Sequence, residues 1–223
     1  MDVVLQNDVV FKELTVSRIT ISSCKQCRRE GLKLFLKGDR CYTDKCAIER
    51  RPYPPGQHGQ SRMKFSEFAL QLREKQKTKR YYGVFERQFR KYFADATKGK
   101  GETGLALLQR LEMRLDNVVY LMGFAANRRE AHHLVVHNHF MVNGKRVNIP
   151  GYEVSPGDVV EVTEKSRQMN KVLGALESVK RREVPSWVEP DHANFKGLVK
   201  DTPGREHVGL TVEENMIVEY YSR

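Results

Sequence analysis

The sequence predicts an α+β protein built from three parts. Clustered cysteines indicate an N-terminal four-cysteine metal module over residues 24–50. Apolar residues at helical spacing then predict a mainly helical body over residues 51–111, which the C-terminal segment 180–223 completes. Two helical patterns followed by hairpin signals predict an inserted module over residues 112–179, with two helices and a small curled antiparallel sheet. Residues 1–23 form an extension to which we assign no structure.

The four cysteines of the chain follow the spacing C-x2-C-x13-C-x4-C: Cys24, Cys27, Cys41 and Cys46. Two close pairs can offer four thiolates to one ion, which favours a tetrahedral zinc site and makes Zn2+ the expected cofactor. An iron–sulfur cluster bound by the same thiolates is the less favoured alternative. Disulfides are the third alternative, but residues 1–23 lack the long apolar run of a signal peptide to an oxidising compartment. The basic neighbours are expected to lower the pKa values of the thiols: Lys25, Arg28, Arg29 and Lys45.

The charge of the chain indicates a polyanionic partner. Its 39 Lys and Arg residues outnumber 28 Asp and Glu residues, which gives a net charge of +11. Residues 25–64 hold eleven basic and four acidic residues, whereas residues 183–223 hold four and eight. This segregation favours nucleic acid. A membrane is not expected as a partner, because the sequence shows neither a span-length apolar run nor a clear amphipathic anchor.

The body is expected to begin with a proline-rich connector over residues 50–59 and to continue as helices. His58, in the connector, is more typical of an RNA-contacting or solvent-facing side chain than of a catalytic base or metal ligand. Ser66 can cap a helix over residues 67–79, with Phe65 and Leu70 as a hydrophobic staple and Phe68 on the buried side. A second helix carries an apolar stripe that we interpret as core rather than as a base-stacking platform: Phe85, Phe89, Tyr92, Phe93 and Ala96.

The inserted module has the clearest local signals. A helix over residues 114–122 is ended by Gly123, and Asn127 opens the next helix with Glu130 as its capping-box partner. Asn143-Gly144 predicts a tight hairpin turn. After a further helix, Trp187 is expected to anchor packing, and residues 216–221 are expected to form short strands or extended segments.

Several motifs resemble the bacterial-type family of small ribosomal subunit protein four and the small RNA-binding module that is named after it. The module motifs are RLDNVVY (114–120), ANRREA (126–131) and VNGKRVNIP (142–150). The remaining motifs are CKQCRREG (24–31), CYTDKC (41–46), RPYPPGQHG (51–59), QLREKQK (71–77), YGVFERQFR (82–90) and VEYYSR (218–223). The resemblance covers about residues 24–223.

The resemblance implies a structural constituent of the small ribosomal subunit in the bacterial cytoplasm. Such a protein is a primary binder of 16S-type rRNA at a helical junction in the 5′ domain, nucleates assembly and contributes to translational accuracy. Small-subunit protein five is implied as a neighbour, with the mRNA entry path nearby. The residues expected to contact RNA before the inserted module are Arg28, Arg29, Arg50, Arg51, His58, Arg62, Lys64, Arg73, Lys77 and Lys79. Those expected in the module are Arg114, Arg128, Arg129, His132, Lys145 and Arg146.

Two other classes of protein fit the sequence less well. An RNA-modifying enzyme with the same RNA-binding module needs a separate catalytic domain, and no segment is left for one, so we expect no enzymatic activity. A zinc-dependent DNA regulator needs a recognition helix, but a proline-rich connector follows Cys46.

Overall fold

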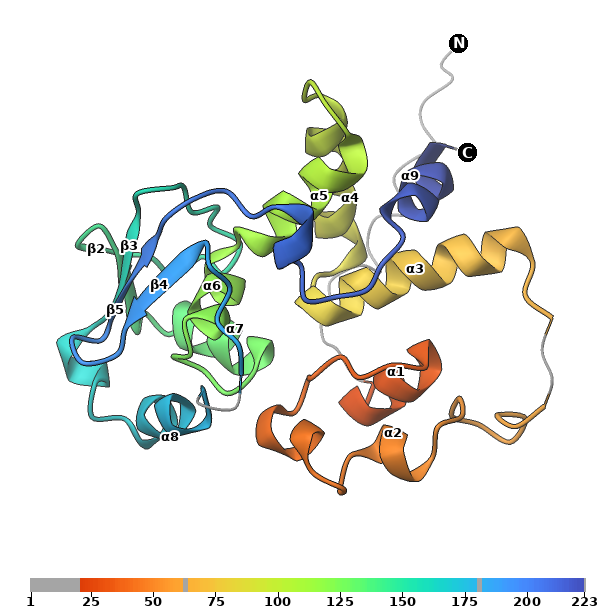
Figure 1. Ribbon diagram of the computed structural model, residues 1–223, viewed down its shortest axis with the longest axis horizontal. Coiled ribbons are helices and arrows are strands. Elements are labelled where there is room, and N and C mark those ends of the chain that lie inside the picture. Colours follow the sequence, from red (N-terminus) through yellow and green to blue (C-terminus); the bar gives the residue numbers. More distant parts are fainter. Residues whose placement is uncertain (1–20, 62–63, 180–181, 223) are drawn as a thin grey trace, which may run out of the picture.

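A computed structural model describes residues 21–61, 64–179 and 182–222. It consists of a helical body and a module with a sheet that lie side by side, and the cysteine segment lies along the body (Figure 1). This is the α+β arrangement that the sequence predicts. Most of the N-terminal extension falls outside the described residues. In the described parts of the chain, no helix has both the length and the apolar character to cross a membrane.

The cysteine segment is made of short helices packed against the body. It contains α1 (Ser23–Glu30), the 3-10 turn η1 (Gly38–Tyr42) and α2 (Ala47–Arg50). Leu34, in the loop after α1, is fully buried in the apolar core of the body. The carboxylate of Glu30, at the end of α1, pairs with Arg80 and, at 3.3 Å, with Arg73. The segment is therefore held by both apolar burial and ion pairs.

The body consists of α3 (Glu67–Tyr82), α4 (Glu86–Thr97), α5 (Thr103–Glu112) and the C-terminal α9 (Glu214–Ser222). The Oγ atom of Ser66 accepts a hydrogen bond from the Ala69 amide at 3.3 Å, so this residue caps α3 as predicted. The helix ends at Gly83, whose φ of 67° lies in the left-handed region that glycine tolerates best. The expectation of strands over residues 216–221 is wrong, because this segment is helical and packs against α3 and α5.

The buried face of α3 also differs from the prediction. Phe65, Phe68 and Leu70 are 51%, 48% and 43% exposed, so no buried staple forms. Instead Gln71, Lys75 and Thr78 face α9 and the core. The Lys75 ammonium lies 4.3 Å from the ring centroid of Tyr220 and 2.9 Å from Glu86 Oε1. Because long side chains can bury their methylene groups while the charge is paired, a polar-looking helix face becomes an internal one.

The module with the sheet contains α6 (Leu115–Leu121), α7 (Arg128–Val136) and α8 (Asn170–Val179). Its strands are β1 (Phe140–Val142), β2 (Lys145–Arg146), β3 (Val159–Val162), β4 (Val188–Asp191) and β5 (Lys196–Val199). The module also contains the 3-10 turn η2 (Glu164–Ser166), whereas the turn η3 (Arg205–His207) precedes α9 in the body. The strand order is β2-β1-β3-β5-β4, and every pairing is antiparallel.

The hairpin β4–β5 places part of the C-terminal segment in the module rather than in the body. Val160 of β3 pairs with Gly197 of β5, and Trp187 is 2% exposed in the core of the module. The sequence predicts that all of residues 180–223 complete the body, but only the part that includes η3 and α9 lies there. The close approach of β5 to α6 depends on Gly197, where an added Cβ would lie 2.5 Å from the Met122 sulfur.

Two local predictions in the module are confirmed. Asn143 and Gly144 have φ values of 50° and 74°, as a tight hairpin turn between β1 and β2 requires. The Oδ1 atom of Asn127 accepts a hydrogen bond from the Glu130 amide at 3.0 Å and caps α7. The carboxylate of Glu130 accepts in return from the amide of Ala126, one residue before the expected partner.

Candidate nucleic-acid interface and cysteine cluster

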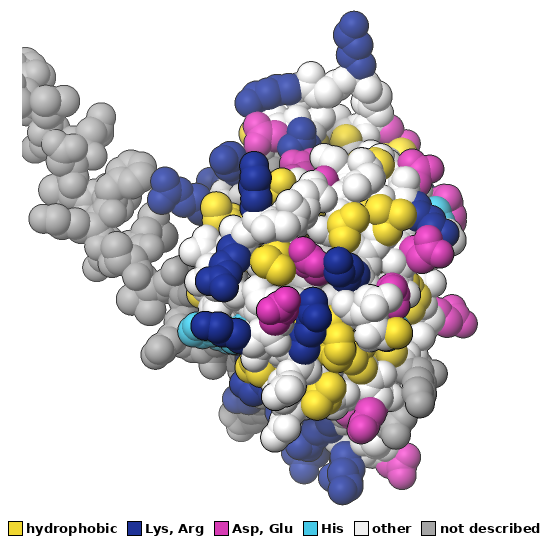
Figure 2. Space-filling model, turned by 90° about the vertical axis from the view of Figure 1, so that its left-hand side faces the viewer, with side chains coloured by type: hydrophobic (Ala, Val, Ile, Leu, Met, Phe, Trp, Pro, Cys, Tyr) yellow, Lys and Arg dark blue, Asp and Glu magenta, His cyan; other side chains and the backbone are white. Residues whose placement is uncertain are grey.

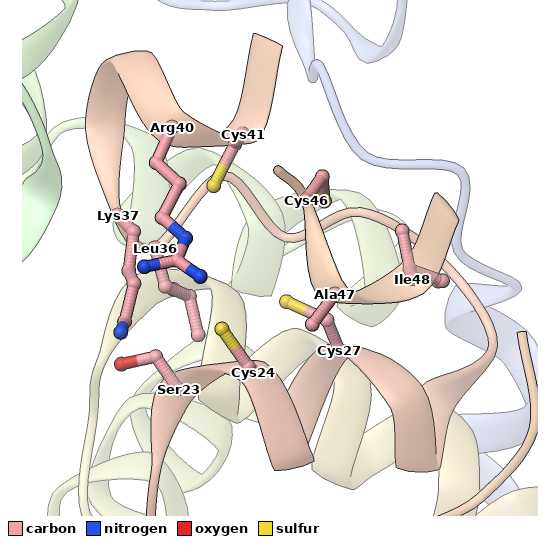
Figure 3. A pocket seen from close by; sticks show the side chains of 10 residues that line it. All are labelled: Ser23, Cys24, Cys27, Leu36, Lys37, Arg40, Cys41, Cys46, Ala47 and Ile48. Carbon is pink, nitrogen blue, oxygen red and sulfur yellow. The ribbon is translucent and has the colours of Figure 1, made fainter. Parts of the chain in front are cut away.

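The four cysteines come together on the N-terminal segment. Their side chains line one cavity of about 10 Å³, which has room for roughly one water-sized particle. Cys24 and Cys27 project from α1 toward Cys41 of η1, and Cys46 lies directly before α2 (Figure 3). Among the residues that the structure describes, no three donors stand in metal-binding geometry. The structure thus brings the predicted ligands to one place without a preformed coordination shell.

Burial has the largest effect on the pKa of two of the thiols, Cys27 and Cys41. Burial raises the pKa of the Cys27 thiol to about 11 and also raises the pKa of Cys41. The expected lowering by Lys25, Arg28, Arg29 and Lys45 is therefore wrong for these two thiols. Without a bound cation, both remain protonated at neutral pH.

Arg28 and Arg29 attach the proline-rich connector to α1. The Nε atom of Arg28 donates to the Tyr53 carbonyl at 2.9 Å, and its guanidinium lies 4.8 Å from the Tyr53 ring centroid. Arg29 donates to the Pro55 carbonyl at 3.4 Å and stays exposed. The sequence predicts both as phosphate contacts, and the structure adds a role in positioning the connector. Farther along the connector, Arg50, Arg51, His58 and Lys64 are exposed, whereas Arg62 lies outside the described residues.

Three predicted RNA contacts on α3 are half-buried and paired with carboxylates. Arg73 contacts Glu30 at 3.3 Å, Lys77 contacts Glu74 at 2.6 Å, and Lys79 contacts Glu86 at 3.0 Å. Burial alone raises the pKa of Glu86, but hydrogen bonds from Lys75 and Lys79 outweigh it and hold this pKa at about 2. These cations stabilise the body, so a phosphate would have to compete for them.

Arg114 is a predicted RNA contact that is buried, with 5% of its surface exposed. Its guanidinium pairs with Asp116, with the shorter contact at 2.6 Å, and donates to the Tyr92 hydroxyl at 2.7 Å. Tyr92 belongs to α4, whereas Asp116 belongs to α6. Arg114 thus joins the body to the module instead of facing solvent.

Arg128 is buried in the same way, with 7% exposure. Its guanidinium carbon lies 3.7 Å from the ring centroid of Tyr81 and 4.5 Å from that of Tyr120. Its Nε donates to Asn117 Oδ1 at 2.7 Å, and Asn117 in turn donates to the buried Glu112 carboxylate at 2.6 Å. The sequence predicts that Arg114 and Arg128 lie on the RNA-contact surface. Both instead form buried joints, because acids and tyrosines far apart in the sequence enclose them.

The remaining module residues are accessible. Arg129, Lys145 and Arg146 are exposed, and they form no ion pair within the described parts of the chain. The His132 side chain is 45% exposed and lies 3.2 Å from Asp116 Oδ2. At the sheet end of the molecule, Lys and Arg side chains follow the left and lower edges of the view, whereas Asp and Glu gather along the right edge (Figure 2). The left and lower edges of this view are therefore better suited to a polyanion than the right edge.

Helix α4 adds basic residues that the predicted set of RNA contacts lacks. Arg87, Arg90 and Lys91 are exposed on the side away from the buried Phe89 and Tyr92. The helical period of that apolar stripe is the signal that could have identified them.

Comparisons with known proteins agree with these features. Residues 18–112 match the family described as "Ribosomal protein S4/S9 N-terminal domain", and residues 113–160 match the "S4 domain". The helical body with its attached S4 module therefore defines an RNA-binding protein of the ribosomal class.

The similarity to individual proteins extends over nearly the whole chain. Small ribosomal subunit protein uS4A of Bdellovibrio bacteriovorus is 67% identical over 93% of this chain and 100% of its own length. The uS4A protein of Myxococcus xanthus is 59% identical, and the uS4 protein of Anaeromyxobacter sp. strain K is 57% identical, with the same coverage. The chain belongs to the bacterial uS4 family of small ribosomal subunit proteins, and its role is structural rather than enzymatic.

Proposed function

We propose that the chain is a primary binder of 16S-type rRNA at a helical junction of the 5′ domain, where it nucleates assembly and supports translational accuracy. The observation that carries the proposal is the presence of exposed cations that form no ion pair with a described residue, among them Arg51, Arg129, Lys145 and Arg146. They come from two parts that buried arginines hold together. A junction offers closely spaced phosphates and few readable base edges, so shape and charge dominate its recognition.

The proposal is tested by filter binding at matched salt concentration. The full chain is titrated with a 5′-domain rRNA fragment, with generic duplex RNA and with duplex DNA of equal length. We expect the rRNA fragment to bind at least tenfold more tightly than either duplex, because only a junction presents phosphates to both parts of the surface. Equal affinity for the three nucleic acids would contradict the proposal.

We also propose that the cysteine cluster holds one structural zinc ion through Cys24, Cys27, Cys41 and Cys46. The donor set supports this, because four cysteines lining one small cavity match the ligands and coordination number of structural zinc. Zinc would stabilise the thiolates against the burial that now raises the pKa of Cys27. It would supply about 10 kcal/mol or more of folding free energy to a segment of short helices. An iron–sulfur cluster is the alternative that the same donors allow.

The family resemblance further suggests small-subunit protein five as a neighbour and an mRNA entry path close by. Residues 183–223 carry an acidic excess, which favours a contact with a basic surface.

A further inference from the structure

A cleft of about 370 Å³ lies between the body and the module. The end of α3 and the start of α4 form its wall on the body, with Arg80, Tyr82 and Phe85. Helix α7 forms the wall on the module, with Arg129, His132 and His133. The buried joint at Arg128 lies at this cleft and keeps the two walls together.

Phe85, on the aromatic side of the cleft, is not explained by core packing. Phe85 begins the apolar stripe of α4, yet it is 40% exposed, whereas Phe89 and Tyr92 of the same stripe are 0% and 6% exposed. Phe85 occupies the N-cap position of α4, where Ser, Thr, Asp or Asn is preferred because the side chain can bond a free amide. A phenylalanine at this position makes no such bond, so its exposed ring neither caps the helix nor fills the core.

The charged side of the cleft is positive. Arg80 is paired with Glu30, and the acid in the wall, Asp116, is already paired with Arg114. Arg129 is exposed and makes no ion pair with any described residue. The rings of His132 and His133 lie 6.1 Å apart on the same wall. An anion that enters therefore meets the available guanidinium of Arg129 and the imidazole of His133, next to the His132 ring that lies 3.2 Å from Asp116 Oδ2.

We propose that this cleft receives one unpaired RNA nucleotide, with its base against Phe85 and its phosphate beside Arg129 and the two histidines. The inference rests on the proposed function and adds a defined subsite to it. A cleft of this volume is of the size that holds one small ligand, and a duplex is too wide to enter. Unstacked nucleotides at loops and junctions are commonly bound by aromatic stacking together with a cation at the phosphate.

The test uses the full-length protein, the four nucleoside 5′-monophosphates and inorganic phosphate. Binding is followed by NMR through the imidazole resonances of His132 and His133. We expect the monophosphates to bind about fivefold or more tightly than phosphate, because stacking of one base contributes at least this factor. Phe85→Leu should remove the difference, and Phe85→Tyr should keep it. Tyr152→Leu is the matched control, since Tyr152 is similarly exposed, at 38%, but does not line the cleft.

Three results would overturn the inference: absence of saturable monophosphate binding, equal affinity for monophosphates and phosphate, or unchanged discrimination in Phe85→Leu. Binding of the 5′-domain rRNA fragment is measured on the same samples. If the wild-type protein binds this fragment specifically but shows any of the three results, only the subsite fails. If the fragment itself binds no better than generic duplex RNA, the proposed function fails.

Discussion

Replacement of Arg128 by methionine tests whether a buried cation joins the body to the module. Methionine keeps much of the length and apolar volume of the side chain but removes the charge and all its donors. In the structure the Arg128 guanidinium is enclosed by Tyr81 and Tyr120, and Asn117 links it to the buried Glu112. The substitution therefore leaves Glu112, at 1% exposure, without its cation.

The expected loss of stability is large. The hydrogen bond from Arg128 to Asn117 contributes about 1.5–3 kcal/mol, since its donor is charged. Contacts with the tyrosine rings add roughly 1–2 kcal/mol, because the site is desolvated. The sum agrees with the ~3–5 kcal/mol that removal of one buried charged partner typically costs. This is a large part of the total stability of an ordinary domain, which is about 5–15 kcal/mol.

Urea denaturation at pH 7 measures this loss, with two probes on the same samples. Trp187 is the sole tryptophan of the chain and is buried in the module, so its fluorescence reports on that part. Far-UV circular dichroism reports mainly on the helices of the body. We expect the two transitions to separate in Arg128→Met because one of the two buried arginine joints between the parts is removed.

Arg129→Gln is the matched control, since this adjacent arginine is exposed. It should change stability by less than about 0.5 kcal/mol, as most surface substitutions do. The double substitution Arg128→Met with Glu112→Gln should recover part of the loss, because the buried acid is then neutral. A loss below about 1 kcal/mol in Arg128→Met, or coincident transitions of unchanged midpoint, would refute the reasoning.

Three further predictions concern the other charged and metal-binding groups. The double substitution Cys41→Ser with Cys46→Ser should abolish stoichiometric zinc binding, as measured by metal analysis. It should also expose residues 24–50 to proteolysis, while α3–α5 stay protected. Purified wild-type protein without stoichiometric zinc or iron would contradict the metal site. Glu86→Gln should reduce the free energy of unfolding at pH 7. This difference from wild type should shrink as pH falls from 4.5 toward 2, because the folded-state pKa of Glu86 is lowered from 4.5 to about 2. A difference that urea titrations find to be independent of pH would exclude this role. The double substitution Lys145→Gln with Arg146→Gln should weaken rRNA binding without a change in stability. It should reduce the slope of the logarithm of the binding constant against the logarithm of the salt concentration by about two. An unchanged slope would show that neither side chain contacts a phosphate.

The sequence predicts well those features that depend on local chemistry. Ser66 and Asn127 cap their helices because short polar side chains can reach the free amides of the first turn. Asn143-Gly144 forms the hairpin turn because both residues tolerate positive φ. The cysteine spacing likewise brings all four thiols to one cavity.

Features that depend on distant partners could not be predicted in this way. The sequence predicts Arg114 and Arg128 as phosphate contacts. Only the folded chain shows that Tyr92 contacts Arg114, and that Tyr81 and the linked Glu112 lie beside Arg128. The apolar pattern of residues 216–221 fits either a strand or a helix, and the segment is helical in the structure, where α9 packs against α3. The β4–β5 hairpin joins the sheet of the module because its partner β3 lies there.

The central claim, that this chain is an rRNA-binding constituent of the small ribosomal subunit, is tested most directly by sedimentation. A tagged copy is expressed in the source cells, and a lysate is separated on a sucrose gradient before and after a wash at high salt. The account predicts that the protein sediments with the small subunit in both cases, in about one copy for each 16S-type rRNA. Recovery at the top of the gradient, in material free of rRNA, would contradict it.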